Sequence, residues 1–216
     1  MKYFPTKIPS VLKKLLPGFV WNMPRDEKIL YITFDDGPIP DVTEWVLDEL
    51  KKHNAKATFF CIGDNVKKHP KIFSRLLSEG HCIGNHTYNH LKGWKTDTDT
   101  YITNILKAED TFRENPAYGL QKSKIFRPPY GEISISKARA LRKSGYNIIM
   151  WEVIALDWIA ETPKKSATNI ISNATNGSVV VFHDSLKAER NMKYALAKTL
   201  EHFSDLGFEF KGLSGV

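Results

Sequence analysis

Leu30-Tyr31-Ile32-Thr33-Phe34-Asp35-Asp36-Gly37-Pro38 is the stretch around which the rest of the chain is organised. Its first five residues are aliphatic, β-branched or aromatic, which is typical of a buried strand. Gly37 can adopt backbone angles that other residues rarely adopt, and Pro38 restricts the backbone where the chain leaves the turn. We therefore expect a sharp turn just after the two acids. Adjacent carboxylates at a strand end repel each other, which favours a bound cation or a shifted pKa. The Asp-Asp-Gly triplet is also common turn chemistry, and this run alone leaves both interpretations open.

On both sides of the acids, the chain alternates between apolar runs and helical patterns. Strands are expected at 57–62, 82–84, 146–151, 178–182 and 208–210; helices are expected at 41–53, 70–79, 98–114, 136–144, from 163 onward, and at 192–203. Such alternation implies an α/β domain with a parallel sheet covered by helices. The polar clusters follow strands directly, at the edge where α/β barrels carry their chemistry.

Composition narrows the class of protein. The chain has 216 residues, 42% hydrophobic and 25% charged, which suits one globular domain. Its net charge of +7 comes from scattered lysines without a basic stripe, so we expect no nucleic-acid partner. The two cysteines, Cys61 and Cys82, cannot form a disulfide framework, and both fall in apolar runs, so we expect buried thiols.

The N-terminus lacks the pattern of a secretory signal. Lys13 and Lys14 interrupt its apolar part and Pro17-Gly18 follows at once, while no stretch is long enough to span a bilayer. We therefore expect a cytoplasmic or membrane-peripheral location. A short basic amphipathic helix is expected here, packed against the domain, with peripheral membrane contact through residues 10–19 as the alternative. Its apolar face would contain Val11, Leu12, Leu15, Leu16 and Phe19.

His86 and His90 are four residues apart. On a helix, both imidazoles would lie on one face and could bind the same metal ion. A carboxylate from the end of the first strand would complete a His-His-Asp set with room for water, which is an open catalytic site. A chance pair in a loop is the alternative. The other histidines (His53, His69, His81 and His202) are expected to face solvent or to lie at helix ends.

Five ordered motifs resemble those of the polysaccharide deacetylases, the NodB-homology domain of carbohydrate esterase family 4. They are Thr33-Phe34-Asp35-Asp36-Gly37-Pro38, His86-Thr87-Tyr88-Asn89-His90, Arg127-Pro128-Pro129-Tyr130-Gly131, Asp157-Trp158 and Val181-Phe182-His183-Asp184. The resemblance implies a distorted (β/α) barrel with about seven parallel strands. We expect this single domain to span residues 28–212, after a lead-in segment at 1–27.

The resemblance also implies a metal centre. Asp36, His86 and His90 would bind one divalent metal ion, most often Zn²⁺ in this family, which lowers the pKa of its bound water to about 7. Asp35 would be the general base. His183 would be the general acid that protonates the departing amine.

Supporting roles are implied for the remaining motif residues. Arg127 would hold Asp35, and Asp157 would orient His183 and keep it protonated. The backbone N–H of Tyr130 would help to stabilise the oxyanion. The substrate pocket would be lined by Trp158, Val181 and Pro129. Two positions depart from the family pattern: Ile154 replaces a frequent acid, and Val181 replaces a usual leucine, which should widen the acetyl pocket slightly.

The resulting functional hypothesis is a bacterial-type, metal-dependent hydrolase. It would remove N-acetyl groups from an acetylated amino sugar or glycan of the chitin-oligosaccharide or peptidoglycan type. One alternative is an amidase or deformylase of the same fold that acts on a small molecule. Another is an inactive glycan-binding domain. Both alternatives would be expected to lose part of the Asp-His-His set, Asp35 or His183, and the chain keeps them all.

Overall fold

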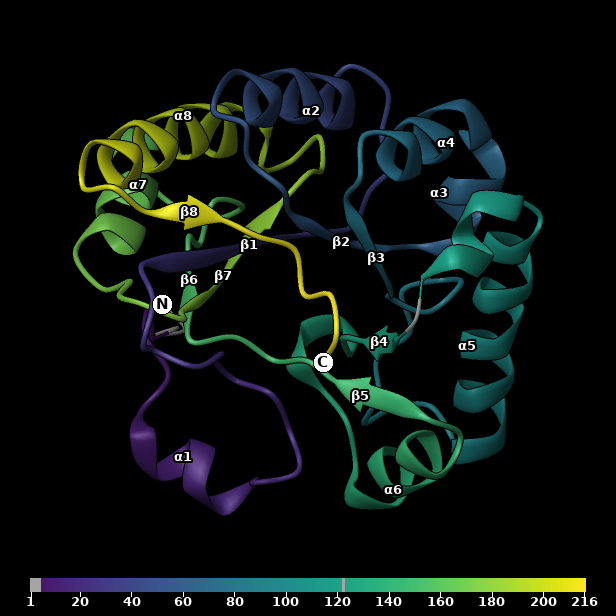
Figure 1. The fold of residues 1–216 in the computed structure, drawn as a ribbon. Helices are drawn as coiled ribbons and strands as arrows, with labels where there is room; N and C mark the ends of the chain where they lie inside the picture. The colour runs from purple at the N-terminus through teal and green to yellow at the C-terminus, as the bar shows by residue number, and fades with distance from the viewer. Residues whose placement is uncertain (1–4, 122) are drawn as a thin grey trace.

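A curled sheet of parallel strands, ringed by helices, forms the centre of the molecule in the computed structural model, which describes residues 5–121 and 123–216 (Figure 1). Its seven strands run in the order β5-β4-β3-β2-β1-β7-β6, and the short β8 (Glu209–Phe210) pairs with β1. The open side of the curl lies between β5 and β6, so the expected distorted barrel is confirmed. The seven strands are β1 (Ile29–Asp35), β2 (Thr58–Cys61), β3 (Cys82–Asn85), β4 (Lys124–Phe126), β5 (Tyr146–Ile148), β6 (Val153–Ile154) and β7 (Val179–His183).

The expected helices are present with small shifts at their ends. Three of them begin at side-chain caps: Asp97, Ser134 and Thr162 each accept a backbone N–H from the first turn. The helices around the sheet are α2 (Val42–Lys52), α3 (Gly63–Lys68), α4 (Pro70–Ser78), α5 (Thr98–Arg113), α6 (Ile135–Lys143), α7 (Pro163–Ile171) and α8 (Glu189–Asp205), with 3₁₀ turns at Pro116–Leu120 and Pro129–Gly131. The α3 helix was not predicted, because it is short and mostly polar.

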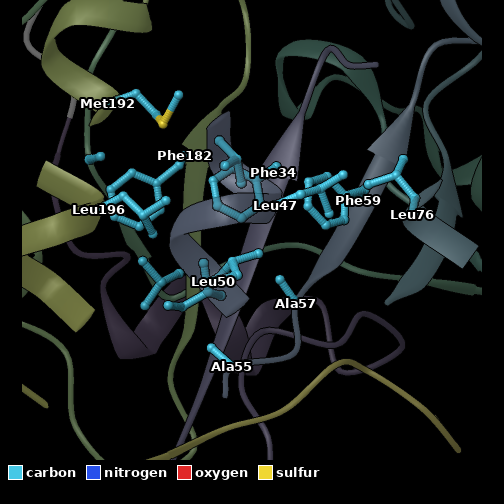
Figure 2. Packing of buried hydrophobic residues seen from close by; sticks show 14 of the residues in the cluster. Phe34, Leu47, Leu50, Ala55, Ala57, Phe59, Leu76, Phe182, Met192 and Leu196 are labelled. Atoms are coloured by element: carbon cyan, nitrogen blue, oxygen red, sulfur yellow. The ribbon is translucent and has the colours of Figure 1, made fainter. Parts of the chain in front are cut away.

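The main core lies between the sheet and the helices α2 and α8. Phe34 of β1 pairs in register with Phe59 of β2 and Phe182 of β7, and its ring lies 4.9 Å and 5.9 Å from theirs. All three rings are buried (Figure 2). Alternation along β1 therefore points Phe34 toward the helices and leaves Thr33 and Asp35 on the inner face of the barrel. Burial of each such ring contributes roughly 1.5–3 kcal/mol.

The N-terminal segment closes the gap between β5 and β6. Lys7 forms an antiparallel bridge with Val153, and Val20 forms a parallel bridge with Ile149. Buried Glu152 fastens the segment: both of its carboxylate oxygens lie 2.8 Å from the Arg25 guanidinium, and Oε1 also accepts a hydrogen bond from Lys13. The lead-in segment is thus part of the barrel wall.

The helix expected in this segment is short. It spans α1 (Ser10–Leu15), which lies apart from the other helices at the lower left of Figure 1. Leu16 and Phe19 pack against the apolar cluster around Trp21, as expected. In contrast, the apolar side chains that α1 leaves exposed are Val11, Leu12 and Leu15. Membrane contact through residues 10–19 stays a prediction. Among the described residues, no helix combines the length and the hydropathy that crossing a bilayer requires.

Three local expectations were wrong or incomplete. The strand expected at 146–151 ends at Ile148: Ile149 still donates its N–H to Phe126 of β4, but Met150 donates to Val20 of the N-terminal segment instead. His81 is buried rather than solvent-facing: it accepts the Ala57 N–H at 3.2 Å, and burial lowers its pKa to about 4. Cys61 is buried as expected, whereas Cys82 is partly exposed; both thiols are free.

Candidate active site

The motif residues meet at the carboxyl edge of the sheet, although they come from distant parts of the sequence. Asp35 ends β1, His86 follows β3, Arg127 follows β4, and His183 ends β7. Asp35 and His183 are paired Cα partners on neighbouring strands. This edge of a parallel α/β barrel is where catalytic residues are collected.

Asp36, His86 and His90 form a cluster whose ligand atoms all lie within 4.8 Å of one another. Oδ1 of Asp36 is 3.3 Å from Nε2 of His90 and 3.9 Å from Nε2 of His86. Nδ1 of His86 donates to the carbonyl oxygen of Arg127 at 2.7 Å, which leaves Nε2 as the ligand atom. Two imidazoles and one carboxylate around an open position fit a divalent cation such as Zn²⁺.

Burial favours the neutral form of both imidazoles. It lowers the pKa of His86, and it lowers the pKa of His90 to about 4. Neutral imidazole is the form that binds metals. Nδ1 of His90 lies 3.1 Å from the hydroxyl oxygen of Tyr130, whose ring packs 4.6 Å from the imidazole. The Tyr130 hydroxyl therefore contacts the side of His90 that faces away from Asp36.

The segment from His86 to His90 is not helical, which corrects the helical reading of the His spacing. Thr87 and His90 both have left-handed backbone angles, with φ of 64° and 55°. The Asn85 side chain accepts the Thr87 N–H at 2.9 Å, and the Asn104 side chain on α5 accepts the next two N–H groups at 2.8 Å and 3.0 Å. These bonds hold the turn in a conformation that β-branched residues rarely adopt.

Arg127 is completely buried and holds Asp35. Its Nη1 donates to Oδ1 of Asp35 at 2.7 Å and to Oγ1 of Thr33 at 2.6 Å, while Nη2 donates to the carbonyl of Met150 at 2.8 Å. Burial alone would raise the pKa of Asp35, but the charges of Arg127, His86 and His183 and the hydrogen bond from Arg127 together outweigh it, and the pKa is lowered. Asp35 is therefore an anion at neutral pH, as a general base must be.

Asp157 holds His183 through both of its carboxylate oxygens. Oδ1 lies 2.8 Å from Nδ1 of the ring, and Oδ2 accepts the His183 backbone N–H at 2.8 Å. Trp158 packs edge-on against the imidazole at 4.6 Å. Burial would lower the pKa of His183, but the charge and hydrogen bond of Asp157, together with the charges of Asp36 and Asp35, outweigh it and raise the pKa to about 9. The ring is therefore protonated at neutral pH and can act as an acid.

Asp35 and His183 face a pocket of about 500 Å³, which is also lined by the three candidate metal ligands. Trp158 and Val181 line the pocket as expected, whereas Pro128 lines it in the place where Pro129 was expected. Tyr130 lines the pocket too, with a left-handed φ of 59°. Part of the wall comes from residues that sequence reasoning missed: Pro5, Ile8, Trp151, Leu156, Ser185 and Lys187.

Asp184 is a further residue without a predicted role, although it belongs to the fifth motif. It is buried, accepts the Gly37 N–H at 3.0 Å, and accepts a hydrogen bond from the Thr43 hydroxyl at 2.5 Å. A Cβ on residue 37 would lie 2.0 Å from Oδ2 of Asp184, so only glycine fits between Asp36 and this carboxylate. Burial raises the pKa of Asp184 to about 8. Asp184 therefore holds the turn at Gly37 that directs Asp36 toward the two histidines of the candidate metal cluster.

An anionic Asp35 and a protonated His183 face a His-His-Asp cluster across one pocket, at the carboxyl edge of a parallel barrel, and this arrangement fits a hydrolase. A family model described as polysaccharide deacetylase matches residues 22–149. The chain belongs to the polysaccharide deacetylase family, and the class of enzyme expected from the motifs is confirmed.

Individual relatives agree with this assignment. One peptidoglycan-N-acetylglucosamine deacetylase of Bacillus cereus is 36% identical over 168 residues, which cover 78% of this chain and 60% of the relative. A second one from the same organism is 35% identical over 206 residues, which cover 94% of this chain and 95% of the relative. A chitooligosaccharide deacetylase of Azorhizobium caulinodans is 34% identical over 77% of this chain and 79% of its own. A crystal structure of a peptidoglycan N-acetylglucosamine deacetylase, in complex with a naphthalenyl-substituted N-hydroxybenzamide, is 34% identical, with a TM-score of 0.84 and 91% of each chain covered.

Proposed function

We propose that this protein is a metal-dependent deacetylase that removes acetyl groups from N-acetylglucosamine residues of peptidoglycan. The observation that carries the proposal is the pairing of Asp35 with His183 on adjacent strands, both facing the Asp36, His86 and His90 cluster. The two B. cereus relatives, both peptidoglycan-N-acetylglucosamine deacetylases, support this choice of glycan.

The residues divide the reaction between them. A divalent cation held by Asp36, His86 and His90 would supply Lewis acidity toward the acetamide carbonyl and toward a water molecule. Asp35 accepts a proton from that water as its oxygen attacks the carbonyl carbon. His183 donates a proton to the amide nitrogen as the C–N bond breaks. The products are acetate and a free amine, so atoms and charge balance.

Neighbouring groups hold these two proton carriers in place. Arg127 keeps Asp35 anionic, and Asp157 holds Nδ1 of His183, so that its other ring nitrogen is the one left to donate. The backbone N–H of Tyr130 is proposed as a donor to the oxyanion, a type of contact worth roughly 10²–10³ in rate. Trp158 and Val181 are proposed to enclose the acetyl methyl group.

Release of acetate and of free amines from purified peptidoglycan tests the proposal. Activity is expected to disappear after chelation and to return with Zn²⁺, and Asp35→Asn should abolish turnover while metal binding remains. Chito-oligosaccharides form the second arm, because the A. caulinodans relative is a chitooligosaccharide deacetylase. Acetate release from neither glycan, with metal bound, would contradict the proposal. Activity that survives prolonged chelation would favour a metal-independent amidase instead.

A further inference from the structure

One flank of the catalytic pocket is apolar. The sheet order places β6 and β7 on one side of β1, and places β3, which leads to the two histidines of the metal cluster, on the other side. Ile154 of β6 and Val181 of β7 are Cα partners, and both line the pocket. Val181 lies two residues before His183 and so faces the same side of the strand. The apolar flank therefore begins directly beside the proposed acid.

The N-terminal segment extends this flank. Ile8 lines the pocket, and its N–H donates to the carbonyl of Glu152 at 2.9 Å, while the N–H of Ile154 donates to the carbonyl of Thr6 at 2.9 Å. These two bonds lay the segment against β6, so that Ile8 and Ile154 point into the same pocket. The ion pairs of buried Glu152 with Lys13 and Arg25 hold the segment there. Ile8 is thus a fixed wall.

The pocket is larger than an acetyl group requires, and the apolar side chains of this flank suit a hydrocarbon chain better than a sugar ring. Pockets of about 300–1,000 Å³ enclose whole drug-sized ligands, and the pocket here has about 500 Å³. A sugar ring needs hydrogen-bond partners for its hydroxyls, and Ile8, Ile154 and Val181 offer none from their side chains. An acyl chain, in contrast, gains about 0.8 kcal/mol for each CH₂ that it buries against such walls.

We propose that the flank formed by Ile8, Ile154 and Val181 is an acyl-chain subsite, and that the enzyme also hydrolyses N-propionyl and N-butyryl amino sugars. This inference rests on the proposed deacetylase function and names its acyl specificity. The reaction is unchanged: the water oxygen bonds to the acyl carbon, the C–N bond breaks, and the amine takes a proton from His183. The products are the longer carboxylate and the free amine.

The test uses one glycan with three acyl groups. Peptidoglycan strands are fully de-N-acetylated and then re-acylated with acetic, propionic or butyric anhydride. The release of free amines is measured for all three with the same reagent. For the wild-type enzyme, kcat/KM for the butyryl substrate is expected within about tenfold of that for the acetyl substrate. A pocket without a subsite would lose about 10–200-fold for each added methylene.

Variants then locate the subsite. Val181→Leu adds one methylene inside the flank and should lower the butyryl-to-acetyl ratio of kcat/KM by at least about tenfold. Val180→Leu is the matched control, because Val180 of the same strand belongs to the core on the helix side, and it should leave the ratio unchanged. Ile8→Phe narrows the subsite from the N-terminal segment and should also lower the ratio. It is a second probe if Val181→Leu does not fold.

The outcomes separate the two proposals. A wild-type enzyme that cleaves the acetyl substrate but is more than about 100-fold slower on the butyryl substrate would overturn the subsite and leave the deacetylase function intact. A ratio that changes equally in the Val181→Leu and Val180→Leu variants would also overturn it. No amine release from any of the three substrates would contradict the deacetylase function, and this inference with it.

Discussion

Asp157 holds His183 through two hydrogen bonds of 2.8 Å, one to the ring and one to the backbone N–H. The two-point contact fixes both the position and the charge of the imidazole. Because Asp157 is completely buried and His183 is nearly so, little solvent screens the interaction. The carboxylate therefore determines over which pH range His183 can give up a proton.

The first prediction concerns that pH range. The pKa of His183 is raised from 6.5 to about 9, so the protonated form persists through neutral pH and is lost as the pH rises through about 9. The protonated His183 ring also stabilises the fold. This contribution is fully present below about pH 6.5 and is lost as the pH rises through about 9. The alkaline limb of the kcat profile is expected near pH 9, and Asp157→Asn should move that limb toward neutral pH. A limb that stays in place in Asp157→Asn would contradict the role of Asp157.

The second prediction concerns the buried ion pair of Arg127 with Asp35. Removal of the guanidinium leaves a buried carboxylate without its charge partner, which costs about 3–5 kcal/mol in similar cases. Arg127→Ala is therefore expected to lower the free energy of unfolding by about this amount in urea titrations. Arg139→Ala removes an exposed arginine on α6 and should change it by less than about 0.5 kcal/mol. Equal effects of the two substitutions would rule out a special role for the pair.

Much of this architecture was predictable, because its determinants are local. Period-2 and period-3.6 apolar patterns together with Gly and Pro positions placed most strands and helices within a few residues. The carboxyl ends of parallel strands share one edge, so motifs that follow β1, β3, β4 and β7 had to converge once the topology was known. The order of the motifs along the chain was therefore enough to predict most of the residues that meet in the site.

The parts that were not predictable depend on contacts between distant residues. The left-handed angles of Thr87 and His90 are held partly by Asn104, which lies on α5 and has no local signature in the sequence. The pocket wall formed by Ile8 depends on β6 being an edge strand of the sheet, which is a property of the whole sheet. His81 is buried because its ring packs edge-on against Phe59 at 5.3 Å and its Nδ1 accepts the Ala57 N–H, although it follows a helix-ending glycine.

The third prediction concerns the contact between Tyr130 and His90. The hydroxyl lies 3.1 Å from Nδ1 of the imidazole, and such outer contacts orient metal-binding histidines. Tyr130→Phe removes the hydroxyl, and it is expected to weaken Zn²⁺ binding about 10-fold in calorimetric titrations. Tyr194→Phe, at an exposed position on α8, is the matched control and should bind Zn²⁺ like the wild type. Unchanged affinity in Tyr130→Phe would contradict a positioning role.

The fourth prediction concerns the attachment of the N-terminal segment by Glu152. Burial would raise the pKa of this carboxyl, but hydrogen bonds from Lys13, Ser178 and Arg25 outweigh it and lower the pKa below 4.5. The attachment is therefore fully present above about pH 4.5, and it is lost as the pH falls through the lowered pKa of the folded state. At neutral pH, Glu152→Gln removes the anion and mimics this loss without acid.

Trypsin cleavage after Lys7 or Lys14 reports the release of that segment. Glu152→Gln is expected to be cut at these sites several-fold faster than the wild type, because a locally detached segment is open to the protease. Glu161→Gln, which neutralises an exposed carboxylate elsewhere on the surface, should be cut at the wild-type rate. Since Ile8 belongs to the same segment and lines the pocket, Glu152→Gln should also lower kcat/KM for the glycan substrate. Faster cleavage with no change in kcat/KM would mean that the segment closes the barrel without shaping the pocket.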